Sequence, residues 1–123
     1  MADFTSSTAV RNSSATLNLL AAQASQTFDM SAVADEKFLL IAENGNADVD
    51  GLKAATITIA PGGFLANVLG TLSVSVAASS VNTVIGPLEG MRFKSTASKI
   101  TVGVSVTASG TVSSVKLACI KLP

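Results

Sequence analysis

Apolar and polar residues alternate strictly along three stretches of this chain. Residues 54–60 (AATITIA), 71–77 (TLSVSVA) and 100–107 (ITVGVSVT) carry apolar side chains at every second position, with threonine, serine or glycine between them. Successive side chains of a β-strand point to opposite faces, so this period of two predicts strands. Each strand is expected to have one buried face and one face in contact with water or a partner.

Four less regular stretches also favour strands. They are residues 37–43 (KFLLIAE), 81–85 (VNTVI), 91–94 (MRFK) and 112–122 (VSSVKLACIKL). Clusters of Gly, Pro, Asn and Asp separate the stretches and predict short turns. With seven to eight strands at short spacing, the sequence predicts an all-β fold. The expected form is a single antiparallel β-sandwich, either jelly-roll-like or a small barrel.

The beginning of the chain has a different character. Residues 1–15 are small, polar and aperiodic, and they predict an extended N-terminal arm, disordered alone or ordered by a neighbour. The sandwich domain is then expected to span residues 16–123. Residues 15–25 (ATLNLLAAQAS) match a short helix or a strand followed by a turn, and we favour the strand-like or irregular form. Phe4 and Arg11 are the candidate assembly contacts of the arm.

The composition excludes several classes of partner. Eight basic and eight acidic residues give a net charge of zero, and charged residues make up 13% of the chain, so no basic field is expected to attract nucleic acid. Serine and threonine supply 28 of the 123 residues. Removing water from a neutral surface of hydroxyl groups costs little free energy, which suits a protein whose surface is covered by partners. Monomeric proteins can have the same composition. No signal peptide and no membrane-spanning stretch are expected.

Few residues in this sequence could carry chemistry. The chain has no histidine, so the commonest general base and zinc ligand is missing, and no Ser-His-Asp or Cys-His site is possible. The single cysteine, Cys119, lies in an apolar run and is expected to be a small buried residue. Residues 46–51 (NADVDG) match the start of a calcium loop, but the twelfth position is Ile57 instead of a carboxylate. The sequence leaves open whether two carboxylates lie close together in space. We predict no enzyme activity, no cofactor and no metal.

Residues 86–95 (GPLEGMRFKS) concentrate charge in a chain that has little of it. Proline removes a ladder donor, so Gly86-Pro87 should end the preceding strand. The favoured interpretation is a corner between two strands, in which Phe93 anchors the core and Glu89 pairs locally with Arg92. The alternative is that Glu89 and Arg92 make contacts between subunits or with a larger assembly, and both are candidate assembly residues.

Short motifs in this chain resemble small virion structural proteins of tailed bacteriophages, of the capsid decoration (cement) type. The matching pieces are Asp35-Glu36-Lys37-Phe38, Gly86-Pro87-Leu88-Glu89, Arg92-Phe93 and Ile120-Lys121-Leu122-Pro123. The resemblance implies a β-sandwich attached to the outside of a capsid, often as a symmetric oligomer.

The expected function is therefore a structural virion protein that binds the major capsid protein, bridges capsomers and is made in the host cytoplasm. A homotrimer is favoured, because it would match the local threefold positions of a capsid. The alternatives are a tail or head-fibre component, or a binding module for carbohydrate or a host surface. The absence of Trp and Tyr counts against carbohydrate binding.

Overall fold

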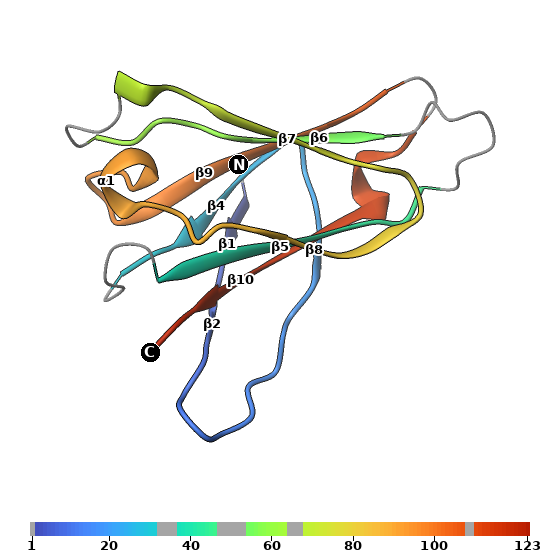
Figure 1. The fold of residues 1–123 in the computed structure, drawn as a ribbon. Coiled ribbons are helices and arrows are strands. Elements are labelled where there is room, and N and C mark those ends of the chain that lie inside the picture. The colour runs from blue at the N-terminus through green and yellow to red at the C-terminus, as the bar shows by residue number, and fades with distance from the viewer. Residues whose placement is uncertain (1, 32–36, 47–53, 64–67, 108–109) are drawn as a thin grey trace.

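The computed structural model describes residues 2–31, 37–46, 54–63, 68–107 and 110–123. Over these ranges the chain is almost entirely β-structure, and its strands form two sheets that lie one above the other (Figure 1). This confirms the predicted all-β sandwich. The described strands form two open sheets and no closed barrel.

The first sheet, called sheet A, has the strand order β1–β4–β9–β6–β7. Its strands are β1 (Ala2–Phe4), β4 (Ser25–Asp29), β9 (Lys99–Val106), β6 (Ala55–Ile59) and β7 (Leu72–Val76). β1 runs parallel to β4, and the other neighbours are antiparallel.

The second sheet, called sheet B, has the strand order β2–β10–β5–β8, and β3 also pairs with β10. Its strands are β2 (Ser7–Thr8), β10 (Val115–Lys121), β5 (Phe38–Asn44), β8 (Ser80–Ile85) and β3 (Leu20–Ala21). β2 runs parallel to β10, while β3 and β5 run antiparallel to it.

Two details of the predicted sandwich need correction. The described chain has ten strands instead of seven or eight. β1, β2 and β3 are only two or three residues long and give no alternating pattern, and the five-residue β4 was also not predicted. Both sheets are mixed and not purely antiparallel, since residues 2–8 pair in parallel with one strand of each sheet. In this chain the N-terminal segment is therefore extended and paired within the same molecule.

The inner faces of the sheets form the core. β5 and β6 alternate strictly between buried and half-buried residues, and for β6 the sequence predicted this alternation. The largest fully buried apolar side chains come from both sheets and from the corner after β8: Phe28, Met30, Phe38, Leu40, Ile57, Ile59, Leu88, Ile100 and Leu117. Burial of these side chains drives the sheets together, because each contributes about 1.5–3 kcal/mol relative to exposure.

The corner after β8 differs from the prediction. Gly86 ends the strand with a φ of +122°, which favours glycine. Residues 91–94 were expected to form a strand, but Gly90–Phe93 form one turn of helix, α1. Four alternating residues fit a single helical turn as well as a strand, so the pattern was too short to decide. Phe93 is buried as expected, whereas Met91 is 44% exposed and does not share its face.

Two buried asparagines join the loops at the end of the sandwich where β5 finishes. The Asn44 Oδ1 atom accepts hydrogen bonds from the backbone and side-chain nitrogens of Asn46, at 3.1 and 2.9 Å. The Asn46 side chain in turn pairs with the backbone of Thr111, donating to its oxygen at 3.0 Å and accepting from its nitrogen at 2.7 Å. Asn44 also donates to the Val76 oxygen at 3.3 Å. These contacts connect both sheets and the loop before β10.

We predict that Asn46→Ala lowers the free energy of unfolding by about 1–3 kcal/mol, because it leaves partly buried backbone groups of Thr111 without their partner. Urea unfolding followed by circular dichroism measures the change. Asn18→Ala, at an exposed position in the loop after β2, is the control and should leave stability unchanged. Equal effects for the two variants would contradict a structural role for the Asn44–Asn46 pair.

Candidate functional site

The described residues hold few of the groups that enzymes use. No group of three or more Cys, Asp or Glu side chains among them could hold a metal ion. Cys119 is buried as predicted, and burial raises the pKa of its thiol well above the usual range. None of the described helices is long and apolar enough to cross a membrane.

The candidate calcium loop lies mostly outside the described residues, which resume at Ala54 after Asn46. Asn46 itself is committed to the contacts with Asn44 and Thr111. Ile57, at the position where a calcium loop needs a carboxylate, is fully buried in β6. The described part of this segment thus has a structural role.

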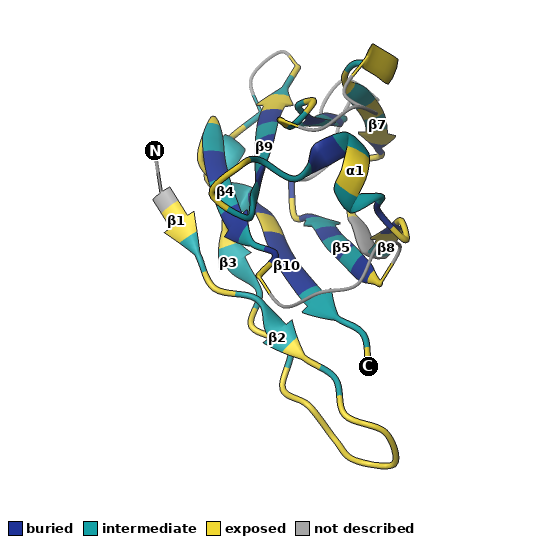
Figure 2. Cartoon of the chain, turned by 90° about the vertical axis from the view of Figure 1, so that its left-hand side faces the viewer, coloured by how far each residue is buried: buried dark blue, intermediate teal, exposed yellow. Residues whose placement is uncertain are grey.

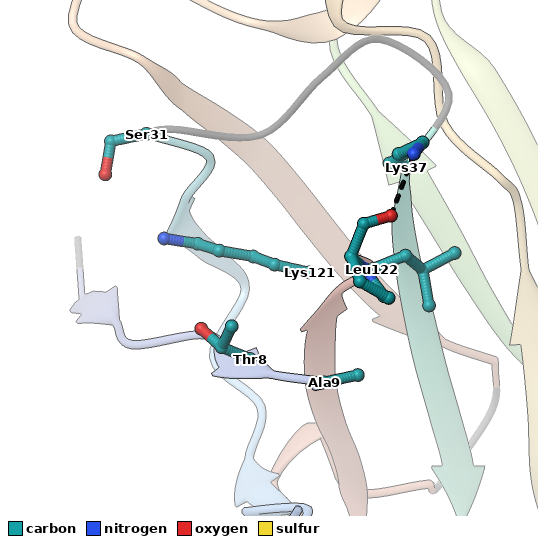
Figure 3. A pocket seen from close by; sticks show the side chains of 7 residues that line it. Thr8, Ala9, Ser31, Lys37, Lys121 and Leu122 are labelled. Carbon is teal, nitrogen blue, oxygen red and sulfur yellow. Dashed lines mark hydrogen bonds between the residues drawn. The ribbon is translucent and has the colours of Figure 1, made fainter. Parts of the chain in front are cut away.

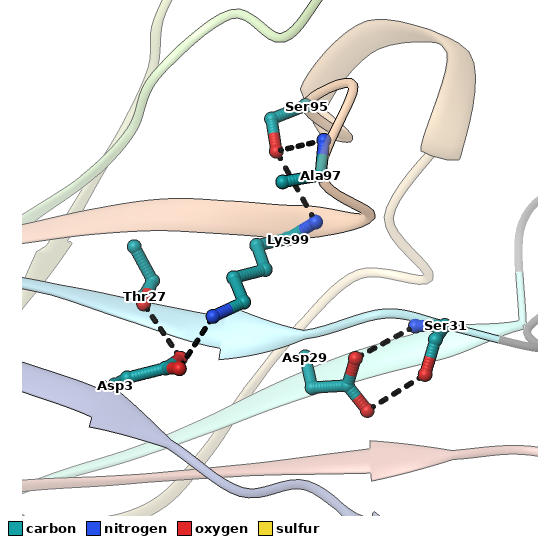
Figure 4. A network of polar contacts seen from close by, with 7 residues as sticks. All are labelled: Asp3, Thr27, Asp29, Ser31, Ser95, Ala97 and Lys99. Atoms are coloured by element: carbon teal, nitrogen blue, oxygen red, sulfur yellow. Dashed lines mark hydrogen bonds and ion pairs between the residues drawn. The ribbon is translucent and has the colours of Figure 1, made fainter.

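The N-terminal segment pairs with one strand of each sheet along one side of the sandwich, and Figure 4 shows the contacts of its Asp3 with sheet A. Asp3 of β1 forms an ion pair with Lys99 of β9 and accepts a hydrogen bond from the Thr27 hydroxyl at 2.8 Å. The hydrogen bond from Lys99 is the main cause that lowers the pKa of Asp3. Phe4 packs edge-on against Phe28, with ring centroids 5.3 Å apart. This candidate assembly residue is therefore half-buried within its own chain.

A second ion pair crosses from sheet B to sheet A at the same side. Lys121 Nζ lies 2.7 Å from Asp29 Oδ2, and Ser31 donates to both oxygens of that carboxylate. The hydrogen bond from Lys121, followed by those from Ser31, lowers the pKa of Asp29 to about 2, although partial burial acts in the opposite direction. Ser6 donates its hydroxyl to the Asp29 backbone oxygen at 2.7 Å.

A pocket of about 370 Å³ lies beside this ion pair (Figure 3). It is lined by Thr8, Ala9, Ser31, Lys37, Lys121, Leu122 and Pro123. Both of its ammonium groups are engaged within the chain, since Lys37 Nζ donates to the Pro123 oxygen at 2.8 Å and Lys121 pairs with Asp29. The pocket therefore has no strong signature of an anion site.

The outer faces of the two sheets differ in chemistry. The outward positions of four strands of sheet A carry mainly hydroxyl groups, and we call them the hydroxyl face: Ser25, Thr27, Thr56, Thr58, Ser73, Ser75, Thr101 and Ser105. These side chains are half-buried or exposed, and neighbouring strands place them about 4.8 Å apart. The alternation in the sequence predicted the part of this face on β6, β7 and β9, but not Ser25 and Thr27 of β4.

The outward positions of sheet B are apolar at the centre, and we call them the apolar face: Leu39, Ile41, Val84, Ala118 and Ile120. Val84 is 57% exposed, Leu39, Ile41 and Ile120 are half-buried, and Ala118 is buried at 2% exposure. This face was not predicted from the sequence. Residues 37–43 and 112–122 are apolar on both sides, so their patterns did not separate the inner face from the outer one.

The loop of residues 9–19, between β2 and β3, projects from the body. In both Figure 1 and Figure 2 it points away from sheet A, on the side toward which the apolar face is turned. Residues 10–16 are all exposed, and Val10 is 61% exposed. This loop carries Arg11, a candidate assembly residue, at its exposed turn.

The other two candidate residues lie at the corner. Glu89 precedes α1, and its backbone oxygen accepts from Arg92 and Phe93, each at 3.1 Å. The Arg92 side chain donates to the backbone oxygens of Leu69 and Gly70, at 3.4 and 3.3 Å, and stacks over the Phe93 ring at 4.7 Å. In the described chain the Arg92 guanidinium thus contacts the backbone before β7, and the predicted pairing with Glu89 is not among its contacts. A contact of either residue with another subunit stays a prediction.

Comparison with known proteins found no matching family model, no matching curated protein and no matching solved structure.

We predict that Asp29→Asn lowers stability by about 1 kcal/mol at pH 7, a figure reduced for the 39% exposure of the side chain. The pKa of Asp29 is lowered in the folded state, so its contribution is present above the unfolded value of 3.8. That contribution is lost as the pH falls through about 2. The stability difference between wild type and variant should therefore shrink between pH 5 and pH 2.

Urea unfolding at several pH values measures this difference. Lys121→Met is the matched background, in which Asp29→Asn should cost much less, because the charge has lost its partner. A cost that does not change with pH, or that persists in the Lys121→Met background, would show that the ion pair has no stabilising role.

Proposed function

We propose that this chain is a structural virion protein of a tailed bacteriophage, a capsid decoration protein that binds the outside of the capsid and bridges capsomers. It would be made in the host cytoplasm and act on the capsid exterior, with the major capsid protein as its partner. The resemblance of its short motifs to such proteins supports this proposal.

The observation that supports the proposal most is the hydroxyl face of sheet A. Burying an ionised side chain in an interface costs several kcal/mol unless it is paired, whereas a hydroxyl costs less and can both donate and accept. At the centre of this face, Thr58 lies in register with Gly103 and Ser73 on the neighbouring strands. A broad hydrogen-bonding surface, whose Asp3 and Lys99 charges are paired with each other at the β1 side, suits contact with the backbone and side chains of a folded capsid.

Binding to capsids provides the direct test. The protein is mixed with capsids assembled from the major capsid protein encoded in the same genome, and the bound fraction is measured by sedimentation. We expect saturable binding. Protein that stays in the supernatant at every concentration would overturn the decoration proposal, and binding to tails or fibres instead would favour the alternative virion role.

We predict that Thr58→Lys weakens capsid binding about tenfold or more, because it places a charge that must be desolvated at the centre of the hydroxyl face. Thr96→Lys, at an exposed position outside this face, is the matched control and should bind as the wild type does. Circular dichroism checks that both variants fold. If Thr58→Lys binds as tightly as the control, another surface contacts the capsid.

A further inference from the structure

We infer that the apolar face of sheet B is an interface between two copies of this chain, related by a twofold axis. The inference concerns contacts between copies alone, so it does not depend on the capsid proposal. It proposes a dimer in place of the homotrimer that the sequence favoured.

The register of the strands arranges the outward side chains of sheet B in rows. Ala118 of β10 lies opposite Ile41 of β5, which lies opposite Val84 of β8. One row along, Ile120 lies opposite Leu39. Side chains directly opposite one another lie about 4.5–5.5 Å apart at Cβ, so these five form one continuous apolar patch. Contiguous patches of this kind mark interaction sites when they are rimmed by polar residues.

The rim of the patch carries charges of both signs. Lys116 of β10 lies opposite Glu43 of β5, in the row beyond Ala118 and Ile41. Lys116 is exposed and Glu43 is half-buried. A partner with a large charge of one sign would leave one of these two groups without compensation. A second copy carries the same two charges and can satisfy both.

A twofold axis parallel to the strands, midway between β5 and β10, makes the face complementary to itself. Rotation about this axis places β10 of one copy over β5 of the other, without changing the position along the strands. Lys116 then faces Glu43 of the second copy, and Ile41 lies over the row that ends at Ala118, which is already buried within its own chain. The charges match in this orientation, as an isologous interface requires. Sheets that pack face to face keep nearly aligned strands in this way.

The projecting loop fits the same arrangement. β2 and β3 lie beyond β10, so the rotation places them over β8 of the second copy. The loop of residues 9–19 leaves from these strands and extends past the apolar face (Figure 2). Each loop would therefore lie along β8 of the other copy, where Val84 is 57% exposed. Val10, which is 61% exposed in the single chain, would be covered in this contact.

Light scattering on the full chain is the first part of the test, and we expect the mass of two chains. Ile41→Glu should shift the mass to one chain, since it places a charge at the centre of the patch. Thr96→Glu, at an exposed position outside both outer faces, is the matched control and should keep the wild-type mass. A wild-type mass of one chain at all concentrations, or of three chains, would overturn the twofold interface.

Charge reversal tests the twofold pairing itself. Glu43→Lys and Lys116→Glu should each weaken self-association about tenfold or more, because like charges then face each other across the axis. A mixture of the two single variants should recover dimers, since every Lys of one copy then faces a Glu of the other. This recovery leaves the charges within each chain unchanged, so it cannot arise from improved folding. A mixture that stays monomeric would overturn the proposed pairing.

Capsid sedimentation separates this inference from the proposed function. Wild-type protein that is monomeric but binds capsids would refute the twofold interface and support decoration. Dimers that do not bind capsids would support the twofold interface and refute decoration.

Discussion

The packing of the inner faces of sheets A and B against each other is the interaction on which the rest of the structure depends. Phe28 and Ile57 from sheet A meet Phe38, Leu40 and other apolar side chains from sheet B in one core. Because strand side chains alternate, burying one face of each sheet leaves a second face of each sheet turned outward. The two outer faces, one rich in hydroxyls and one apolar, are consequences of this arrangement.

The sandwich needs further contacts at its open sides, since two packed sheets leave edge strands with unpaired backbone groups. Along one side, β1 pairs with β4 of sheet A and β2 pairs with β10 of sheet B, and the ion pair between Lys121 and Asp29 joins the sheets. At the end where β5 finishes, the buried Asn44 and Asn46 join the loops. Polar contacts thus close the regions that the apolar core does not cover.

The different chemistry of the two outer faces suits a protein with two kinds of contact. An apolar patch with a charged rim favours a defined partner. Here the register of β5 and β10, which places Lys116 opposite Glu43, makes a second copy of the chain suitable. A face rich in hydroxyls can bind a partner surface that has many backbone groups, because each hydroxyl can donate or accept a hydrogen bond. A dimer joined through sheet B would leave the two hydroxyl faces uncovered, one on each side of the pair.

The sequence by itself determined the all-β class, the strands β6, β7 and β9 and the inward positions of their apolar residues, because a period of two is a local property of the backbone. It also predicted the burial of Cys119 and Phe93. Only the tertiary structure decided three features. They are the parallel pairing of β1 with β4 and of β2 with β10, the helical turn at residues 90–93, and the roles of Asn44 and Asn46. These segments are too short for a periodic signal, and distant backbone partners determine their conformation. The apolar face depended on tertiary structure for a related reason: in a strand that is apolar on both sides, only the second sheet decides which side becomes the core.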